Sequence, residues 1–312
     1  MGVGREPFHY LETVLARLDA SCTGRLGVTA RLITPKKGAP QAEEVHWHEQ
    51  EQFRTASTVK VAIFAAVLSE ASLGRLDLGR RVPLSAADQA GGSGVLSVMQ
   101  PGLEPTVGDL CTLIIVISDN TATNMLIDLL GGVDSVNRAI RRLGFSDITL
   151  HRKLPYPPPP LVAGVRPPLT KDPGSFATAT PAALLRLVSA VRAGKVVDGS
   201  SSDLIFSTLV HQQYHSGIPR AFLGLAEPGQ APDEWPAVAS KTGSVPGCRT
   251  EVGVVSLPDG SEFAYAVMAD DLADTTMSAL SEGDELLGRV GAALLRHWWP
   301  GPRPVPLRPG WP

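Results

Sequence analysis

Apolar and polar residues follow two different periods along the chain, and the order of the two periods predicts its architecture. Residues 7–21 carry apolar side chains at the three-and-four spacing of an amphipathic helix. Residues 26–34 and 41–47 are β-like runs on either side of segment 35–40, whose prolines and glycine predict a turn. The chain is therefore expected to begin with a helix that covers a two-stranded hairpin.

The middle of the chain is predicted to be helical, because long apolar runs there end at glycines, which are typical of helix ends. Thr106 and Asp109 have the spacing of a capping box at the start of one of these helices. Residues 73–102 show little periodicity and are interpreted as a connecting loop, although they contain the glycine cluster 91–94. The expected helices cover residues 57–68, 106–118, 120–130, 133–143, 181–193 and 201–211.

Residues 151–181 are the least regular part of the sequence and contain nine prolines. Proline removes a backbone donor, so this segment is expected to hold no helix and no central strand. A loop of this length inside a compact domain commonly borders a functional site or acts as a linker.

The C-terminal third returns to strand-like patterns and closes with an amphipathic helix. Strands are expected at 237–244, 250–257 and 262–270, and the helix at 278–299. The sequence therefore predicts one catalytic unit over residues 1–300, with a sheet lobe (1–55 and 220–300), an inserted helical lobe (56–219), and a proline-rich, disordered tail (301–312).

Composition narrows the class of protein. The 312 residues are 43% hydrophobic and 19% charged, as in an ordinary globular protein, and the formal net charge of −3 offers no basic surface for nucleic acid. Neither a leader peptide nor an apolar run of membrane-spanning length is present, so we expect no membrane partner and a cytoplasmic location. The oligomeric state is left open.

Histidines and cysteines give little support for a metal site. His46 and His48 are expected on one strand face, but no third ligand lies nearby, and solvated strand residues explain this pair better. His211 and His215 lie four residues apart, which would suit a metal on a continuous helix, but Gly217 and Pro219 break the helical pattern close by. The three cysteines are widely spaced, and Cys111 lies in an apolar run typical of a core thiol. We therefore expect no metal and no cofactor.

Three short motifs carry the candidate chemistry. Ser57 and Lys60 are three residues apart at the start of a buried helix, where a desolvated amine can be neutral and accept a proton from the hydroxyl. Further along the chain come the tripeptides Ser118-Asp119-Asn120 and Lys241-Thr242-Gly243. Each motif alone is weak evidence, whereas the three in this order are specific.

This set resembles the superfamily of class A serine β-lactamases and penicillin-binding proteins, over roughly residues 7–299. The resemblance implies an α/β plus all-α fold, in which terminal helices flank an antiparallel sheet and an all-helical lobe is inserted. It also implies a serine hydrolase that opens the cyclic amide of a β-lactam, with a small carboxylate-bearing molecule as substrate.

The resemblance also implies the roles of individual residues. Ser57 would be the acylated nucleophile and Lys60 its base, while Ser118 would relay a proton to the leaving nitrogen. Asn120 would contact substrate, and the backbone N–H groups of Ser57 and Ser244 would form the oxyanion hole. Lys241 and Thr242, in the Lys-Thr-Gly motif that ends at Gly243, would bind the substrate carboxylate. Arg249 would add a second cation for this carboxylate, although its distance in sequence from Lys241 differs by one residue from that of the family's arginine.

One departure from the family pattern concerns deacylation. Class A enzymes carry a glutamate within an Arg-x-Glu-Pro pattern that positions the deacylating water, and alignment of Arg152 on that pattern places Leu154 at the glutamate position. No Asp or Glu occurs between Asp147 and Asp172, so a shifted register does not restore the carboxylate. Either Tyr156 or Lys60 serves as the base, or the acyl-enzyme is long-lived.

Three functions fit these observations. The first is a β-lactamase with slow deacylation. The second is a serine esterase, amidase or DD-peptidase-like acyltransferase that acts on another carboxylate-bearing substrate. The third is a non-catalytic penicillin-binding or sensor domain.

Overall fold

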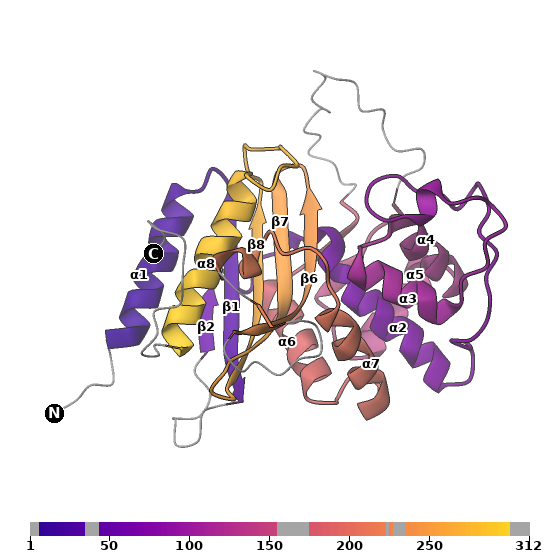
Figure 1. Cartoon of the computed structure of the whole chain (residues 1–312), viewed down its shortest axis with the longest axis horizontal. Coiled ribbons are helices and arrows are strands. Elements are labelled where there is room, and N and C mark those ends of the chain that lie inside the picture. Colours follow the sequence, from indigo (N-terminus) through magenta and orange to yellow (C-terminus); the bar gives the residue numbers. More distant parts are fainter. Residues whose placement is uncertain (1–5, 35–43, 155–174, 223–224, 227–234, 300–312) are drawn as a thin grey trace.

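The computed structural model describes residues 6–34, 44–154, 175–222, 225–226 and 235–299. An antiparallel sheet and two terminal helices form one side of the molecule, and a group of helices forms the other (Figure 1). In the described part of the chain, no helix combines the length and the apolarity needed to cross a membrane. Tyr156, the tail and the 35–40 turn lie outside the described residues.

The main sheet has five strands in the order β2-β1-β8-β7-β6, all antiparallel to their neighbours. Both ends of the chain contribute to it, since β1 pairs along nearly its whole length with β8. The strands are β1 (Arg25–Thr34), β2 (Glu44–Trp47), β6 (Ala237–Val245), β7 (Cys248–Ser256) and β8 (Glu262–Asp270). This confirms the five strands expected from the sequence, with ends that differ by a few residues.

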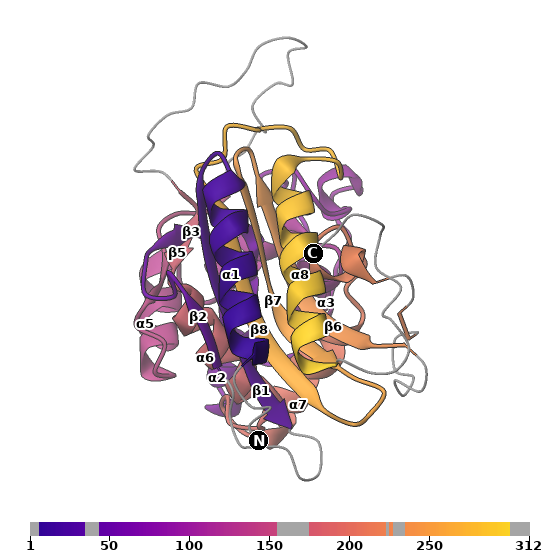
Figure 2. The same ribbon diagram turned by 90° about the vertical axis from the view of Figure 1, so that its left-hand side faces the viewer.

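Alternating side chains place a hydrophobic core on each face of this sheet, as the two-residue period of a strand requires. On one face, Phe263, Tyr265 and Val267 of β8 pack against helices α1 (Glu6–Ser21) and α8 (Glu282–Trp298), which lie side by side in Figure 2. On the other face, residues such as Val252 and Ala266 pack against helix α6 (Pro181–Arg192) and the helical lobe.

A second, three-stranded sheet in the order β3-β5-β4 corrects the expectation for residues 151–181. Its strands are β3 (Phe53–Arg54), β4 (Ile148–Leu150) and β5 (Ala177–Ala179). Strand β5 lies between the other two, so the prediction that no central strand runs through 151–181 is wrong. The strand forms in a stretch between Pro173 and Pro181 that has no proline, which leaves its backbone donors free for pairing.

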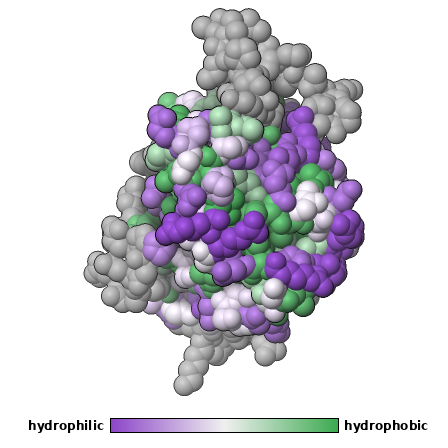
Figure 3. Space-filling model, turned by 90° about the vertical axis from the view of Figure 1, so that its right-hand side faces the viewer, coloured by the Kyte–Doolittle hydropathy of each residue, from purple (hydrophilic) through white to green (hydrophobic). Residues whose placement is uncertain are grey.

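The helical lobe follows the expected order, with helix ends that differ by a few residues. Thr106 and Asp109 form the predicted capping box, in which each side chain bonds the other residue's backbone N–H. Figure 3 views the molecule from the side of this lobe, where hydrophilic side chains surround smaller hydrophobic areas. Besides α6, the larger helices on this side are α2 (Lys60–Ser72), α3 (Val107–Val116), α4 (Asn120–Leu129), α5 (Val133–Arg142) and α7 (Gly199–Val210).

Three short 3₁₀ helices complete the described elements: η1 (Ala56–Val59), η2 (Leu96–Val98) and η3 (Ile218–Ala221). The first corrects the expectation that Ser57 belongs to a continuous α-helix, because α2 begins only at Lys60. The second lies in the region that was expected to be a plain loop.

Candidate active site

Ser57 lies in the tight turn that leads from β3 into α2, and the backbone around it is held from several sides. Its neighbour Ala56 has a left-handed φ of 45°, which is unfavourable for a residue with a Cβ atom and is typical of functional turns. The carbonyl of Thr55 accepts hydrogen bonds from the hydroxyls of Thr58 (2.8 Å) and Thr250 (2.7 Å). The turn is therefore fixed between α2 and strand β7.

Lys60 brings the first and second motifs together. Its side chain is 0% exposed, and its Nζ donates to the carbonyl of Ser118 (2.7 Å), to Ser118 Oγ (3.2 Å) and to Asn120 Oδ1 (2.9 Å). No hydrogen bond joins Lys60 to Ser57 Oγ in this part of the described chain. The hydrogen bonds of Lys60 therefore go to the Ser-Asp-Asn segment, and its pairing with Ser57 stays a prediction.

Burial shifts the protonation equilibrium of this amine. The pKa of Lys60 lies well below its usual value, mainly because the buried ammonium loses its hydration, and further because of the positive charge of Lys241; the charge of Asp119 opposes these effects. The position of Lys60 at the start of α2 acts in the same direction, since the positive end of the helix dipole disfavours a cation. A neutral amine can accept a proton from a nearby hydroxyl.

Ser118 occupies a strained position between α3 and α4. Its φ is 57°, although it is not a glycine, and its side chain is buried. Next to it, the carboxylate of Asp119 caps α4 through Ala122 N–H (2.9 Å) and also accepts from the N–H groups of Val95 and Leu96 (2.7 and 2.9 Å). Asp119 therefore fixes both the motif and the loop beside it.

The glycine cluster at residues 91–94 is a part of the site that sequence reasoning missed. Ser93 Oγ donates to the carbonyl of Ser118 (2.8 Å), and its own carbonyl accepts from Asn120 N–H (3.0 Å). Gly92 and Gly94 have positive φ, and a Cβ atom on either would collide with Asn120 or Asp119. The glycines of the cluster are evident in the sequence, but nothing in the sequence indicates which segment they contact.

Strand β6 carries the Lys-Thr-Gly motif to the Ser57 turn. A Cβ atom added at Gly243 would lie 2.8 Å from Ser57 N and 2.7 Å from the carbonyl of Thr55, so only glycine allows this close approach. Thr242 is half-buried and Ser244, the next residue after the motif, is exposed. The backbone of β6 at residues 243–244 thus runs directly beside the backbone of Ser57.

Lys241 is a second buried amine at this site. It is 0% exposed, and its Nζ donates to the carbonyl of Thr242 (2.6 Å). Its backbone pairs with Val252, whose side chain belongs to the core on the helical side of the sheet. Burial lowers the pKa of Lys241 to about 7, against an opposing effect of Glu251.

Glu251 is a fully buried carboxyl group in the neighbouring strand. Its two oxygens accept from Ile218 N–H (2.7 Å) and from the hydroxyl of Tyr265 (2.9 Å). Desolvation raises the pKa of Glu251 to about 7, while these hydrogen bonds and the charge of Lys241 act against that rise. The charges of the two buried groups are therefore coupled near neutral pH.

Arg249 does not join the other predicted site residues. Its side chain is 3% exposed and forms an ion pair with Asp284 of α8 (3.0 Å). Its other donors bond the carbonyls of Val245, Cys248 and Thr276. Helix α8 covers the face of the sheet opposite the helical lobe, so this corrects the expectation that Arg249 adds a cation to the site.

Leu154, the residue aligned with the deacylating glutamate, is tied to α4. Its N–H donates to Asn124 Oδ1 (2.9 Å), and its carbonyl accepts from Asn124 Nδ2 (3.0 Å). Lys153 adds an ion pair to Asp128 of the same helix (2.5 Å). Residues 153–154 are thus held against α4, and the apolar side chain of Leu154 stands at the last described position of this segment.

Neither histidine pair collects a set of metal ligands in the described part of the chain, where no group of three or more His, Cys, Asp or Glu side chains is arranged to hold an ion. His48 lies just after β2 with a left-handed φ and contacts Glu51, so it does not share a strand face with His46 as expected. His211 and His215 each bond a backbone carbonyl.

The site combines a serine in a tight turn, a buried lysine, a strained Ser-Asp-Asn segment and a Lys-Thr-Gly strand. This arrangement is typical of serine hydrolases that act through an acyl-enzyme. Residues 11–298 match the model of the β-lactamase enzyme family, and the chain belongs to that family. The protein is thus a β-lactamase-type serine hydrolase, with the class A fold that reconstructed class A ancestors also share.

Individual relatives agree with this assignment. A β-lactamase of Rhodobacter capsulatus is 28% identical over 297 residues, which cover 93% of this chain and 90% of the relative. The crystal structure of a β-lactamase from Sphaerobacter thermophilus is 33% identical, with a TM-score of 0.75 and coverage of 95% of this chain and 98% of that one. A structure of a leucine-to-glutamate mutant of PBP-A, an acyl-enzyme complex with penicillin G, is 20% identical with a TM-score of 0.74, and the match covers 92% and 95% of the two chains.

Proposed function

We propose that the protein opens the cyclic amide of β-lactams by forming an acyl-enzyme on Ser57. The observation that carries this proposal is the buried contact of Lys60 with Ser118 and Asn120 at the start of α2, directly after the Ser57 turn. Lys60, neutral in a fraction of the molecules, takes the proton of Ser57 as its oxygen attacks the lactam carbonyl. Ser118 then passes a proton to the lactam nitrogen as the C–N bond breaks.

Stabilisation of the tetrahedral intermediate is assigned to two backbone donors. The close approach at Gly243 supports a role for the N–H groups of Ser57 and Ser244 as the oxyanion hole, because it puts the two backbone segments side by side. Lys241 and Thr242 bind the substrate carboxylate, and Asn120 contacts the substrate while it orders the site.

Slow deacylation is the second part of the proposal. The Leu154 side chain has no lone pair with which to orient a water molecule, and Asn124 holds the Leu154 backbone in place. Formation of an acyl-enzyme is supported by the PBP-A neighbour, whose leucine-to-glutamate mutant was solved as an acyl-enzyme complex with penicillin G.

A DD-peptidase-like acyltransferase or a related esterase or amidase is the second candidate. The same Leu154 favours it, because an acyl-enzyme that excludes water persists long enough for a different acceptor to take the acyl group. Both candidates use the same nucleophile, so the fate of the acyl-enzyme distinguishes them.

Intact-mass measurement after incubation with a penicillin, followed over time, tests the proposal. An adduct equal to the mass of the penicillin that decays slowly to free protein supports a β-lactamase with slow deacylation. An adduct that persists, and that a D-amino acid or hydroxylamine acceptor removes, supports the acyltransferase. The absence of any adduct would contradict β-lactam recognition.

Leu154→Glu is expected to speed hydrolysis of the acyl-enzyme and to leave its formation nearly unchanged, because Ser57 and Lys60 are untouched. A positioned general base contributes about 10²–10⁴-fold, and a carboxylate without designed support should give the lower part of that range. Burst kinetics with a chromogenic cephalosporin separate the two steps. Leu154→Gln is the matched control, and equal deacylation by the two variants would contradict a role as base.

The pKa of Lys241 predicts how substrate binding depends on pH. Below about pH 7 this amine is charged, and above that pH it becomes neutral, so the KM for a carboxylate-bearing β-lactam should rise as the pH increases. A neutral thioester substrate provides the control, since its KM should not follow this trend. In Lys241→Ala the trend should disappear. Parallel pH profiles of KM for both substrates would exclude Lys241 as the carboxylate-binding group.

A further inference from the structure

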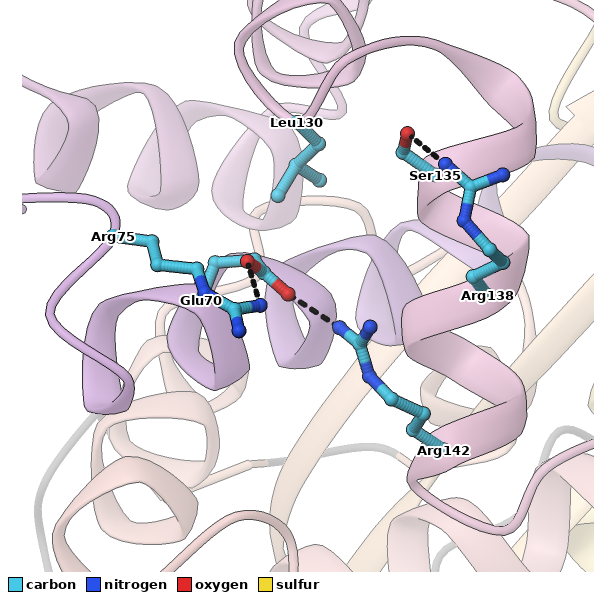
Figure 4. A pocket seen from close by; sticks show the side chains of 6 residues that line it. All are labelled: Glu70, Arg75, Leu130, Ser135, Arg138 and Arg142. Atoms are coloured by element: carbon cyan, nitrogen blue, oxygen red, sulfur yellow. Dashed lines mark hydrogen bonds and ion pairs between the residues drawn. The ribbon is translucent and has the colours of Figure 1, made fainter.

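Three arginines surround a small hollow on the helical lobe, between the end of α2 and the outer face of α5 (Figure 4). Its volume is about 180 Å³, which is room for several water molecules. The hollow is lined by Glu70, Arg75, Leu130, Ser135, Arg138 and Arg142.

The charges around this hollow do not balance. Arg75 forms an ion pair with Glu70 (3.3 Å), and Arg142 bonds the other oxygen of the same carboxylate. Arg138 donates to Ser135 Oγ (2.7 Å), and within the described ranges no carboxylate pairs with it. Since a guanidinium stays protonated at any ordinary pH, one carboxylate faces three positive charges.

Arginine forks suit the oxygens of a phosphate group, which accepts two parallel hydrogen bonds from one guanidinium. The hydroxyl of Ser135, in the first turn of α5, donates to the carbonyl of Gly131 (3.1 Å) and accepts from Arg138, and the positive end of that helix dipole favours an anion there. The side chains of Arg75 and Arg142 are 62% and 51% exposed, so a solute can reach them from the solvent. In Figure 4, Arg138 and Arg142 extend from one face of α5 toward the space beside Leu130.

We propose that this hollow is a binding site for a small phosphate-bearing anion, either inorganic phosphate or a phosphate monoester. The anion bridges Arg138 and Arg142 and neutralises the excess charge, while Leu130 offers an apolar contact to the organic part of an ester. The site is separate from the one around Ser57. Glu70 and Lys60 lie on the same helix, about 15 Å apart along its axis.

Titration of the purified protein with inorganic phosphate at constant ionic strength, followed by calorimetry or ³¹P line width, tests the proposal. We expect saturable binding that Arg138→Gln weakens by about tenfold, the effect of one charge-assisted hydrogen bond. Among the residues that the structure describes, Arg138 has no acidic partner whose release would disturb the fold. Arg141→Gln is the matched control, because Arg141 is exposed on the same helix, does not line the hollow and carries the same charge.

Glycerol phosphate provides a second arm that distinguishes the two sources of the phosphate group. Equal affinity for both probes indicates a site for the phosphate group alone, whereas tighter binding of glycerol phosphate, reduced by Leu130→Ala, indicates a phosphate monoester. Phosphate titration without saturation, or the same loss in Arg138→Gln and Arg141→Gln, would overturn the proposal.

Discussion

Ser57→Ala is expected to abolish the covalent adduct with any penicillin or activated ester. The acyl group needs an oxygen to which it can bond, and alanine removes that oxygen while the turn keeps its backbone contacts through Thr55 and Gly243. Intact mass after a long incubation measures the result directly. Ser207→Ala, which changes an exposed serine on α7, is the matched control and should be labelled like the parent protein.

A persistent adduct in Ser57→Ala would contradict the assignment of the nucleophile. Peptide mapping of that adduct would then identify the reacting residue. Ser93 and Ser118 would be the first to inspect, because their side chains lie in the same hydrogen-bonded group as Lys60.

Lys60→Arg is expected to slow acylation by at least ~10²-fold, which is a typical contribution of a positioned general base. Burial lowers the pKa of Lys60, so a fraction of this amine is neutral and can take the Ser57 proton. Arginine keeps the positive charge and can donate to Ser118 and Asn120, but it remains protonated and cannot act as the base. The rate constant of adduct formation, measured by rapid quench and mass spectrometry, reports the loss.

The pH profile separates this explanation from simple misfolding. In the parent protein, acylation should rise with pH as the neutral fraction of Lys60 grows, whereas the residual acylation of Lys60→Arg should lack that rise. Lys60→Gln, which is smaller and also lacks a basic amine, should lose a similar factor. Acylation of either folded variant within a few-fold of the parent would exclude Lys60 as the base.

The structure brings the three motifs close together, and each motif marks a backbone geometry as well as a side chain. Gly243 is required where β6 approaches Ser57 N, and Asp119 caps α4 while it fixes the adjacent loop. The capping box at Thr106 was similarly a local signal with a local cause. A single sequence predicts two features most reliably: contacts between residues that are close in the chain, and the periodic pattern of apolar positions.

The errors arise where distant segments decide the outcome. Arg249 has the right charge close to the right motif, but its position in β7 directs it to Asp284 on the far side of the sheet. The 91–94 glycine cluster was interpreted as part of a loop, but it lies at the site because Ser93 forms hydrogen bonds with Ser118 and Asn120, which are distant from it in the sequence. Strand β5 likewise depends on partners from β3 and β4.

The pairing of β1 with β8 has a consequence for how the protein is made. As the chain leaves the ribosome, α2 to α5 can form and pack with mostly local contacts, whereas β1 has to wait for a partner strand that is synthesised almost last. Until then β1 and β2 expose an unpaired edge, which is prone to aggregation. The Ser57 turn and Lys60 are therefore synthesised early, but the strand that carries Lys241 and Gly243 can pack against them only when synthesis is nearly complete.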